Sequence, residues 1–570
     1  KMPETTYDAI VVGSGISGGW AAKELTEKGL KVLMLERGNH IEHVKDYVTA
    51  TKEIWEFPHR DTRTQQMIKE HPVLKRDYPL SEQTLGMWVK DTESPYTETK
   101  RFDWFRAYHT GGRSLHWGRQ SYRFSKMDFE ANAKEGIAID WPIRYDDLAP
   151  WYSYVERFAG IQGSKQGLDV LPDGEFMPAM EMNIVEKDLA AKLKTHYNGK
   201  RHMFIGRSAN ITEPHQDRTN CQYRDRCWRG CPFGGYFSTQ SATLPAARKT
   251  GNLTMENNKI VTKLIYDKNT KKATGVEVID AESNKTYTYN AKIIFLCASS
   301  FNSTWVLMNT ATDIWPDGLG SSSGELGHNV MDHHFRLGAN GKVDGYADKY
   351  VYGRRPTGIY IPRFRNVDGD KRDYLRGFGY QGGAGRGRGV EIAEMTIGAD
   401  LKNALTEPND LWNMGITAFG EMLPDHSNKI SLDKTKKDKW GLPVLNFDVE
   451  IKDNEKKMRI DMMNDAKEML EAAGVKDVKT FDSGYAPGQG IHEMGTARMG
   501  HDAKTSVLNK NNQVWGCPNV FVTDGACMAS SNCVNPSLTY MALTARACDF
   551  AVKEIGIFHH KMLCWKGQQR

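Results

Sequence analysis

The chain of 570 residues lacks a strong charge of either sign, because 76 Lys and Arg stand against 71 Asp and Glu and leave a formal net charge of +5. Proteins that bind nucleic acids usually carry a concentrated basic excess, so this balance argues against such a partner. The sequence also lacks a long hydrophobic run. Apolar stretches such as 293–298 are much shorter than the roughly 20 residues of a membrane-spanning helix, so membrane contact is expected only through a partner.

Cysteine is scarce as well. Nine cysteines are odd in number and too few to indicate a disulfide framework. No secretory signal pattern is visible, because a strand pattern begins by Tyr7. Hydrophobic residues make up 39% of the chain and aromatic residues 10%, which excludes a disordered chain and is typical of a globular protein.

The first 40 residues have the order of a dinucleotide-binding unit. A short buried strand is predicted over 8–12, followed by a glycine-rich turn and a helix through Lys28. A second buried strand is predicted over 31–35. Strand, turn, helix and strand within about 30 residues indicate the first unit of a Rossmann-like fold.

The turn itself carries three glycines with distinct roles. Gly13 permits a tight turn, Gly15 lets the backbone approach a pyrophosphate, and Gly18 lets helix and strand pack closely. Glu36 ends the second strand, where a carboxylate accepts hydrogen bonds from ribose hydroxyls. The motif alone does not choose between FAD and NAD. Its position near the N-terminus, with signals of the same site at the other end of the chain, favours FAD.

Other segments have simpler patterns. The alternation over 259–280 predicts a β-hairpin, and 290–298 is predicted to be a buried strand. Helices are predicted over 453–473 and 537–553. The segment 377–389 holds seven glycines and is predicted to be a loop.

A second glycine motif, YHTGGRSLHWG, spans 108–118. Gly111 and Gly112 are small enough to lie flat against a flavin ring. His116 follows them at a position from which its imidazole would reach the flavin edge. The motif predicts either a covalent bond between His116 and the flavin or a hydrogen-bonded structural histidine.

Three cysteines lie close together in the segment 221–232. Cys221, Cys227 and Cys231 are separated by five and three residues, and a proline follows the last of them. Thiolates at this spacing bind soft metals or iron–sulfur clusters. Three ligands favour a three-iron cluster. Zinc with a fourth ligand such as His215, and thiols without a metal, are the alternatives.

The C-terminal part carries candidates for catalysis. His492 precedes a glycine turn in HEMGTARMG, and Asn535 with Pro536 opens the last predicted helix. Alcohol oxidation needs a base for the hydroxyl proton, and a histidine can take that proton near neutral pH. An asparagine can hold the same oxygen by hydrogen bonding. We therefore predict that His492 and Asn535 converge on one pocket.

Taken in order, these motifs resemble the glucose–methanol–choline (GMC) oxidoreductase family over nearly the whole chain. The resemblance includes GELGHNVMDHH at 324–334, NKISLD and KDKWGLPV within 428–444, and VFVTDGACMASSNCVNPSLTYMALTARA at 520–547. Within the family, the chain is most similar to the catalytic subunits of bacterial FAD sugar dehydrogenases that carry a [3Fe-4S] cluster.

The resemblance implies an α/β fold with two interleaved domains. A Rossmann-like FAD-binding domain would take most of 1–335, including the cysteine loop. A substrate-binding domain, α+β and built on an antiparallel sheet, would take most of 336–485. The segment 486–570 would return to the FAD-binding domain and carry the catalytic histidine and asparagine.

The resemblance also implies a reaction, in which a sugar hydroxyl is oxidised by hydride transfer to flavin N5. Electrons would then pass through the [3Fe-4S] cluster to a cytochrome. The C3 hydroxyl of a glucoside or pyranoside is favoured as the site of oxidation. C1 of glucose, C5 of fructose and C2 of gluconate stay open. So do an oxygen-using pyranose or C-glycoside oxidase and a non-redox lyase on the same scaffold.

Residues and partners follow from the same resemblance. Asp524 is expected near the ribityl chain and the pyrophosphate. The expected cofactor residues are Gly13, Gly15, Gly18, Glu36, Gly111, Gly112, His116, Asp524 and Pro536. A small chaperone-like subunit that carries the export signal, a c-type cytochrome subunit and a periplasmic location are expected as well.

Overall fold

The computed structural model describes residues 6–351, 353–387, 397–406 and 412–555. Its first sheet has eight strands, with β1 in the middle between β2 and β8 and parallel to both. These strands form because their apolar side chains are buried on both faces, as in the AIVV run of β1. The strands are β1 (Thr6–Val12), β2 (Val32–Leu35), β5 (Leu253–Glu256), β6 (Lys259–Asp267), β7 (Lys272–Asp280), β8 (Thr286–Leu296), β17 (Gln513–Val514) and β18 (Cys517–Val522).

A second sheet of seven strands is antiparallel throughout and follows the order β16-β10-β13-β12-β11-β4, with β9 paired to β13. Helices α9 (Asp453–Ala472) and α5 (Ile184–His196) pack on its core. The strands are β4 (Phe204–Ile205), β9 (His333–His334), β10 (Leu337–Val343), β11 (Ile359–Ile361), β12 (Phe378–Arg386), β13 (Trp412–Glu421) and β16 (Lys476–Asp482). A third, small sheet joins β3 (Thr97–Glu98), β14 (Lys429–Lys437) and β15 (Pro443–Asp448).

The helices lie on both sheets. Helix α1 packs against α10, and α10 packs against α4. The helices are α1 (Ile16–Glu27), α2 (Gln65–Glu70), α3 (Lys126–Glu135), α4 (Tyr145–Ala159), α5 (Ile184–His196), α6 (Leu244–Lys249), α7 (Ser300–Asn309), α8 (Gly398–Thr406), α9 (Asp453–Ala472) and α10 (Ser537–Ile555). Within the described ranges, no helix combines the length and the apolar character that a bilayer crossing needs.

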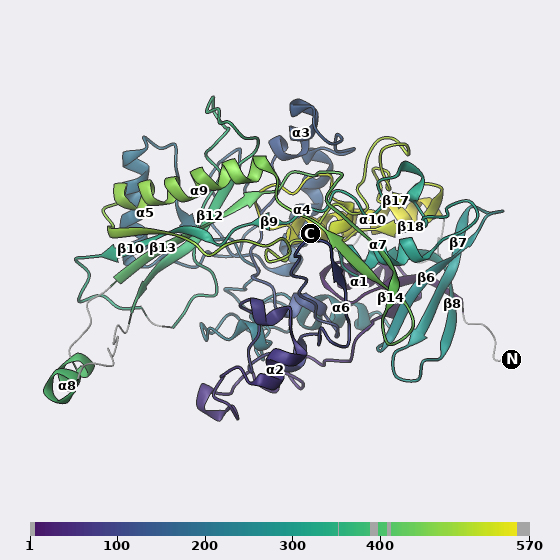
Figure 1. The fold of residues 1–570 in the computed structure, drawn as a ribbon, viewed down its shortest axis with the longest axis horizontal. Helices are drawn as coiled ribbons and strands as arrows, with labels where there is room; N and C mark the ends of the chain where they lie inside the picture. The colour runs from purple at the N-terminus through teal and green to yellow at the C-terminus, as the bar shows by residue number, and fades with distance from the viewer. Residues whose placement is uncertain (1–5, 352, 388–396, 407–411, 556–570) are drawn as a thin grey trace, which may run out of the picture.

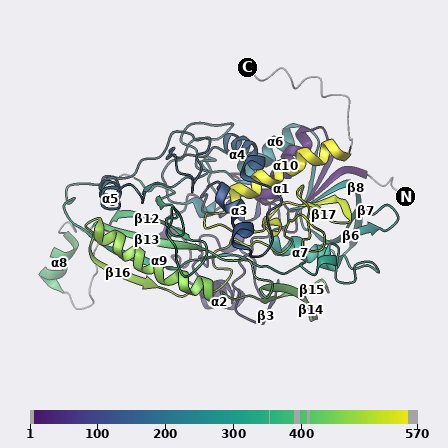
Figure 2. The same cartoon turned by 90° about the horizontal axis from the view of Figure 1, so that it is seen from above.

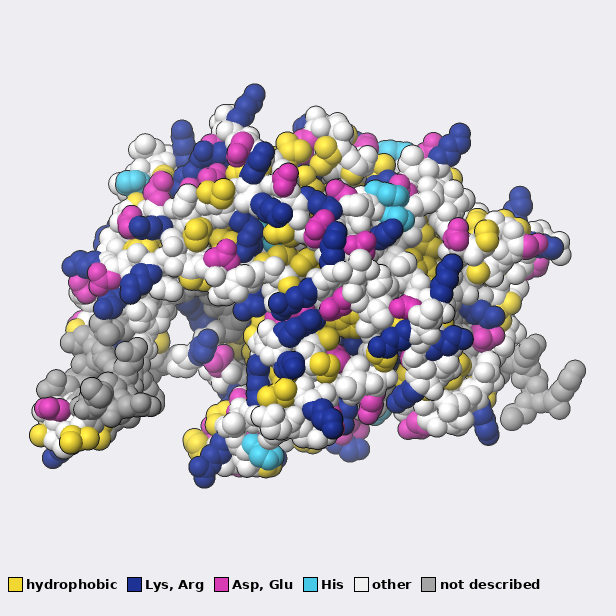
Figure 3. Space-filling model, in the orientation of Figure 1, with side chains coloured by type: hydrophobic (Ala, Val, Ile, Leu, Met, Phe, Trp, Pro, Cys, Tyr) yellow, Lys and Arg dark blue, Asp and Glu magenta, His cyan; other side chains and the backbone are white. Residues whose placement is uncertain are grey.

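The two large sheets occupy opposite ends of the long axis (Figure 1). Helix α9 runs along the second sheet, and α10 lies over the first (Figure 2). Lys and Arg side chains are mixed with Asp and Glu over the face drawn in Figure 3. The fold is therefore mixed α/β, with a Rossmann-like unit and an antiparallel sheet, as the sequence predicts.

Several local predictions are confirmed. The hairpin is β6 and β7, the buried strand is β8, and the two predicted helices are α9 and α10. Strand β4 and helix α5 come from the range 1–335 but pair or pack with the second sheet. The last two residues of the glycine-rich segment, 388 and 389, lie outside the described residues.

The loop predicted over 377–389 is wrong, because residues Phe378–Arg386 form β12 inside the second sheet. Glycine is needed there for packing. A Cβ on Gly379 would lie 2.4 Å from the Tyr360 hydroxyl oxygen, and a Cβ on Gly382 would lie 2.0 Å from the Gly415 carbonyl oxygen. The glycines of β12 therefore admit close neighbours from strands that are distant in sequence.

Candidate active site

A cavity of about 900 Å³ is lined by residues from both sheets. One part of its wall is the turn after β1 together with α10, and another part is Phe335, Gln381 and Phe419 at the second sheet. The predicted site residues that line it are Gly13, Gly15, Glu36, Gly112, His116, His492, Asp524 and Asn535. Gly18, Gly111, Pro536, Cys221, Cys227 and Cys231 do not line it.

The glycine turn has the geometry that dinucleotide binding requires. Gly13 has φ +98°, and a Cβ there would lie 2.4 Å from the Cys297 carbonyl oxygen. A Cβ on Gly18 would lie 1.9 Å from the Gly13 carbonyl oxygen. In contrast, nothing lies within 4 Å of a Cβ on Gly15, whose open side belongs to the cavity. Gly13 and Gly18 thus shape the turn, and Gly15 leaves room for a ligand.

Glu36 stands at the end of β2 beside this turn. Its carboxylate accepts hydrogen bonds from Ser14 N at 3.1 Å and from Gly38 N at 2.8 Å. Burial raises the pKa of Glu36. The Ser14 hydroxyl donates to the same carboxylate. A carboxylate has about four lone-pair sites, so about one remains for a hydroxyl group in the cavity.

The two glycines of the second motif separate in the structure. Gly112 lines the cavity, and an added Cβ would lie 3.6 Å from Gly15 Cα. Gly111 instead has φ +82° and packs against Gln240, where a Cβ would lie 2.1 Å from Oε1. Only Gly112 therefore belongs to the cavity wall.

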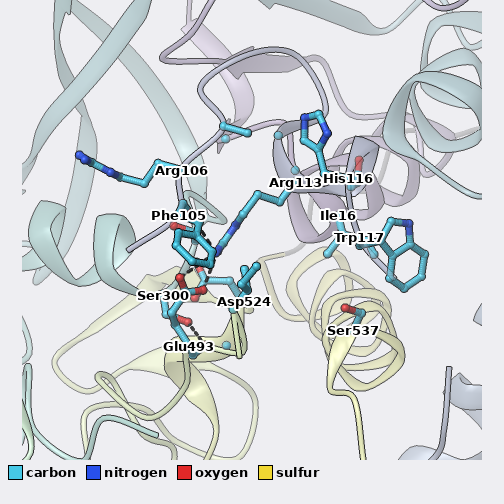
Figure 4. Close-up of a pocket in the computed structure, with 18 of the residues that line it drawn as sticks. Ile16, Phe105, Arg106, Arg113, His116, Trp117, Ser300, Glu493, Asp524 and Ser537 are labelled. Atoms are coloured by element: carbon cyan, nitrogen blue, oxygen red, sulfur yellow. Dashed lines mark hydrogen bonds and ion pairs between the residues drawn. The ribbon is translucent and has the colours of Figure 1, made fainter. Parts of the chain in front are cut away.

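An ion pair crosses the cavity wall between segments that are far apart in sequence. Arg113 donates from both terminal nitrogens to the Glu493 carboxylate, at 2.7 and 2.6 Å. In Figure 4 its side chain extends toward Glu493, while His116 leaves the same turn in another direction. Asp524 lies nearby and accepts from Ser303, and burial raises its pKa to about 6.

His116 is buried, and both of its ring nitrogens have partners. Nδ1 lies 3.0 Å from the Trp228 carbonyl oxygen, and Nε2 lies 3.1 Å from His109 Nε2. The ring stacks on Trp88 at 4.8 Å between centroids. Burial lowers the pKa of His116 to about 3. His116 therefore joins the cavity to the cysteine loop.

His492 and Asn535 converge in the cavity although 43 residues separate them. His492 Nε2 lies 3.4 Å from Asn535 Nδ2, and Gln381 donates to Asn535 Oδ1 at 2.9 Å. His492 Nδ1 lies 2.7 Å from His333 Nδ1. Burial lowers the pKa of His492 well below its ordinary value, and His333 and Arg113 lower it further. This ring is neutral at pH 7 and can accept a proton.

The cysteine loop has features that suit an anionic group held by thiolates. Backbone N–H groups donate to sulfur from Tyr223 to Cys221 and from Gly235 to Cys231, both at 3.4 Å. Such hydrogen bonds are one of the means by which proteins tune clusters. Burial raises the pKa of Cys221 to about 11 and also raises that of Cys227.

Two buried arginines flank this loop without a carboxylate partner among the described residues. Arg119 donates to the Trp117 and Pro356 carbonyl oxygens, and Arg218 donates to the Ala159 carbonyl oxygen. Arg119 Nε and Arg218 Nε and Nη1 are buried with no hydrogen-bond partner. Buried cations are costly unless an anion compensates them.

The three cysteine sulfurs are not gathered as closely as the ligands of one zinc ion. In the described part of the chain, the group of three ligand atoms within 4.8 Å of one another is His40, Glu42 and Asp46, not the cysteines. Thiolates on one zinc lie about 3.8 Å apart, whereas a cluster separates them because each binds a different iron. His215 Nε2 is hydrogen-bonded to the Phe158 carbonyl oxygen at 2.8 Å.

Sequence reasoning assigned no role to His333, Gln381, Arg113, Glu493 or Trp228. His333 lies in the segment 324–334, whose residues indicate the family resemblance and no individual role. Gln381 lies in the segment predicted to be a loop. Their contacts join residues 154 and 159 positions apart, so no local pattern indicates them.

Comparisons with known proteins identify the family of the chain. The Rossmann-like unit and the glycine turn at the cavity are those of a dinucleotide-binding protein. Family models described as GMC oxidoreductase match residues 7–335 and 424–544. The chain belongs to the GMC oxidoreductase family, whose members bind FAD, and it acts on CH–OH donors.

Individual relatives are similar over nearly their whole length. The 2-methyl-1,2-propanediol dehydrogenase of Mycolicibacterium austroafricanum is 28% identical over 95% of this chain and 94% of its own. The fructose dehydrogenase large subunit of Gluconobacter japonicus is 25% identical over 96% of this chain and 98% of its own. The crystal structure of pyridoxine 4-oxidase from Mesorbium loti shares the fold, with TM-score 0.58 and 17% identity over 97% and 100%.

Proposed function

We propose that this protein is an FAD-dependent dehydrogenase that oxidises a hydroxyl of a sugar or glycoside, with the C3 hydroxyl of a glucoside as the first candidate. The observation that carries the proposal is the convergence of His492 and Asn535 on the cavity that also contains the glycine turn. Bound FAD supplies the acceptor for the hydride that leaves the carbinol carbon.

His492 acts as the base. Its ring is neutral, and Nε2 faces the Asn535 amide at the cavity wall. A substrate hydroxyl that lies beside both groups gives its proton to His492 Nε2 and accepts a hydrogen bond from Asn535 Nδ2. Gln381 holds that amide through Oδ1, so its N–H group stays directed at the reacting oxygen.

The remaining walls suit a ring that has both apolar and hydroxyl faces. Phe335 and Phe419 stack on each other, with centroids 5.0 Å apart, and both line the cavity. Gln120 and Gln381 add amide groups. The choice of C3 rests on the resemblance of 324–334, and His333 of that segment contacts the proposed base. C1, C5 and C2 oxidation are its competitors.

We propose that the cysteine loop binds a [3Fe-4S] cluster through Cys221, Cys227 and Cys231. The donor set and the two uncompensated arginines support an anionic group there. The cluster supplies a one-electron carrier. Trp228, between two of these cysteines, lines the cavity, and its carbonyl oxygen is hydrogen-bonded to His116. The loop therefore adjoins the cavity, and we propose that it receives electrons from the flavin bound there.

FAD is proposed to be held without a bond to His116, because such a bond would break one of the two hydrogen bonds of that ring. Acid precipitation should release the flavin into the supernatant. Flavin that stays with the precipitate in the wild type, and is released from His116→Ala, would contradict this.

The acceptor is proposed to be a c-type cytochrome subunit in the periplasm, with a small chaperone-like subunit that carries the export signal. Exposed aromatic side chains around the cysteine loop support a protein partner, namely Tyr223, Trp228 and Phe233. The segment beside them exposes Val48 and Trp55, and Arg226 of the loop pairs with Glu53.

The function is tested by an anaerobic visible titration with methyl β-glucoside. Bleaching of the flavin band is expected and would show that a free C1 is not needed. Bleaching with glucose but not with the glucoside would move the reaction to C1. No bleaching with any sugar, in a protein loaded with FAD, would contradict the sugar assignment. In a separate aerobic assay, oxygen consumed in proportion to the sugar oxidised would favour an oxidase.

The cluster is tested by substitution. Cys227→Ser should lose iron and acid-labile sulfide, keep anaerobic flavin reduction by substrate, and reduce a cytochrome more slowly. The buried Cys548 provides a matched control, because Cys548→Ser removes a thiol far from the loop in sequence and should keep its iron. Wild-type protein without iron after anaerobic preparation would contradict the cluster.

A further inference from the structure

His333 lies beside the proposed base and is buried on the short strand β9, which pairs with β13. Its Nδ1 is 2.7 Å from His492 Nδ1. Its Nε2 is 2.5 Å from the Asn532 carbonyl oxygen and 3.2 Å from the Ser531 carbonyl oxygen. The ring therefore joins the His492 side chain to the backbone just before Asn535.

The positions of the protons follow from these partners. Carbonyl oxygens only accept, so His333 Nε2 carries a hydrogen. In a neutral ring the other nitrogen then has a lone pair, so His333 Nδ1 accepts. His492 Nδ1 must carry the hydrogen that is donated across the 2.7 Å contact. His492 Nε2 is thereby left without a hydrogen, at the cavity.

We propose that His333 is a positioning residue that fixes His492 in the tautomer with a bare Nε2, the form that can accept a substrate proton. The inference rests on the proposed role of His492 as the base. It adds that this role depends on a second histidine 159 residues away.

A second set of contacts agrees with this tautomer. Gln381 Nε2 donates to Asn535 Oδ1, which leaves Asn535 Nδ2 directed at His492 Nε2. An N–H group there suits a nitrogen with a lone pair. Hydrogen bonds from the His333 side and from the Gln381 side therefore require the same state of His492.

The orientation of the segment is fixed separately. Asp332 accepts from the backbone N–H of His492 at 3.1 Å and from Gly488, Gly490 and Tyr485, so its carboxylate is bonded to groups other than the His333 ring. The other charged groups that act on the histidine pair are Glu421 and Arg113. Removing the His333 ring should thus change the proton position on His492 more than the path of its backbone.

Two variants distinguish the role of His333 as a hydrogen-bond acceptor from the role of its ring volume. In His333→Asn, the amide oxygen can take the place of Nδ1 and accept from His492. His333→Leu fills similar space but accepts nothing. We expect the leucine variant to reduce flavin about 100-fold more slowly at saturating substrate, within the range that a misplaced general base costs. The asparagine variant should stay within about 10-fold of the wild type.

The matched control is His334→Leu, which removes the neighbouring buried histidine of the same strand. His334 approaches Arg459 and makes no hydrogen bond to His492. We expect this variant to be less stable but to keep the flavin reduction rate. Equal slowing in the His334 and His333 leucine variants, with normal FAD content, would overturn the proposal.

Nitrogen NMR of histidine-labelled protein gives a readout that does not depend on turnover. Two-bond proton–nitrogen correlations should show His492, assigned by its loss in His492→Ala, with hydrogen on Nδ1. In His333→Leu, His492 should carry its hydrogen on Nε2 or be a mixture of the two tautomers. A wild-type His492 with hydrogen on Nε2 would overturn the proposal. Correct tautomers without reduction by any sugar would instead contradict the proposed function.

The pH profile gives a third readout. In His333→Leu, the rate of flavin reduction should recover as the pH rises, because hydroxide or buffer can replace the base. A merely structural defect would slow the reaction equally at every pH. A pH-independent deficit would overturn the positioning role.

Discussion

Two glycine-rich segments meet at the cavity and use the same residue for different reasons. In the turn after β1, Gly13 has φ +98°, which other residues adopt only with strain. In β12, the backbone of Gly379 and Gly382 is ordinary, and the neighbouring strands exclude a side chain. In the first segment glycine is required by the local backbone conformation, whereas in the second it is required by the packing of neighbouring strands. The same composition therefore gives a turn in one place and a strand in the other.

Gly18→Ala should have the largest effect. Alanine favours a helix by about 1 kcal/mol over glycine, but its Cβ would lie 1.9 Å from the Gly13 carbonyl oxygen. We expect a loss of about 3 kcal/mol of stability and almost no bound FAD, as measured by thermal unfolding and the flavin absorbance per chain. Gly15→Ala is the control, because a Cβ there meets no protein atom. It should weaken FAD binding but leave the stability of the FAD-free protein unchanged.

Gly382→Ala tests the packing reason in the second segment. Its Cβ would lie 2.0 Å from the Gly415 carbonyl oxygen of β13. We expect a loss of about 2 kcal/mol of stability, and slower flavin reduction because Gln381 is the adjacent residue. Unfolding by denaturant, followed by tryptophan fluorescence, measures the first effect. Unchanged stability would show that β12 does not need glycine there.

Gln381→Leu removes the group that β12 provides to the site without disturbing its glycines. Asn535 would lose the donor to Oδ1, at present 2.9 Å away, and its amide could turn. We expect flavin reduction about 10-fold slower, with normal FAD content and stability. Gln381→Glu offers an acceptor in place of the donor and should be slower still. A wild-type rate of flavin reduction in both variants would show that Gln381 of β12 does not contribute to catalysis.

Gly385→Ala should have the smallest effect, because nothing lies within 4 Å of a Cβ at this exposed position of β12. Stability should rise by about 0.5 kcal/mol, since alanine loses less entropy on folding. Thermal unfolding beside Gly382→Ala provides the measurement. A loss as large as that of Gly382→Ala would mean that β12 needs flexibility rather than close packing.

The contrast explains how much the sequence predicts. The turn at Gly13 and Gly18 and the strands around it are set by residues within 30 positions, so their pattern is visible. The motifs around His492 and Asn535, supported by the family resemblance, predict that these residues converge, and the structure places them 3.4 Å apart. The network that holds them was missed, because His333 and Gln381 act through contacts that only the second sheet creates.

The same reasoning applies to charge. Arg113 and Glu493 pair across 380 residues, and each alone is an ordinary charged residue. The glycines of β12 predict a loop from the sequence alone, because the atoms that would clash with a Cβ there belong to other strands. Sequence patterns report on neighbours along the chain, and these features depend on neighbours in space.

The position of Trp228 has a consequence for how such a protein can change over evolution. This residue lies between two of the three cysteines, lines the cavity and is hydrogen-bonded through its carbonyl oxygen to His116. A lineage that abandons the cysteines is free to rebuild the loop, but it then also rebuilds a part of the cavity wall. If the loop carries electrons as proposed, the electron acceptor and the shape of the cavity change together.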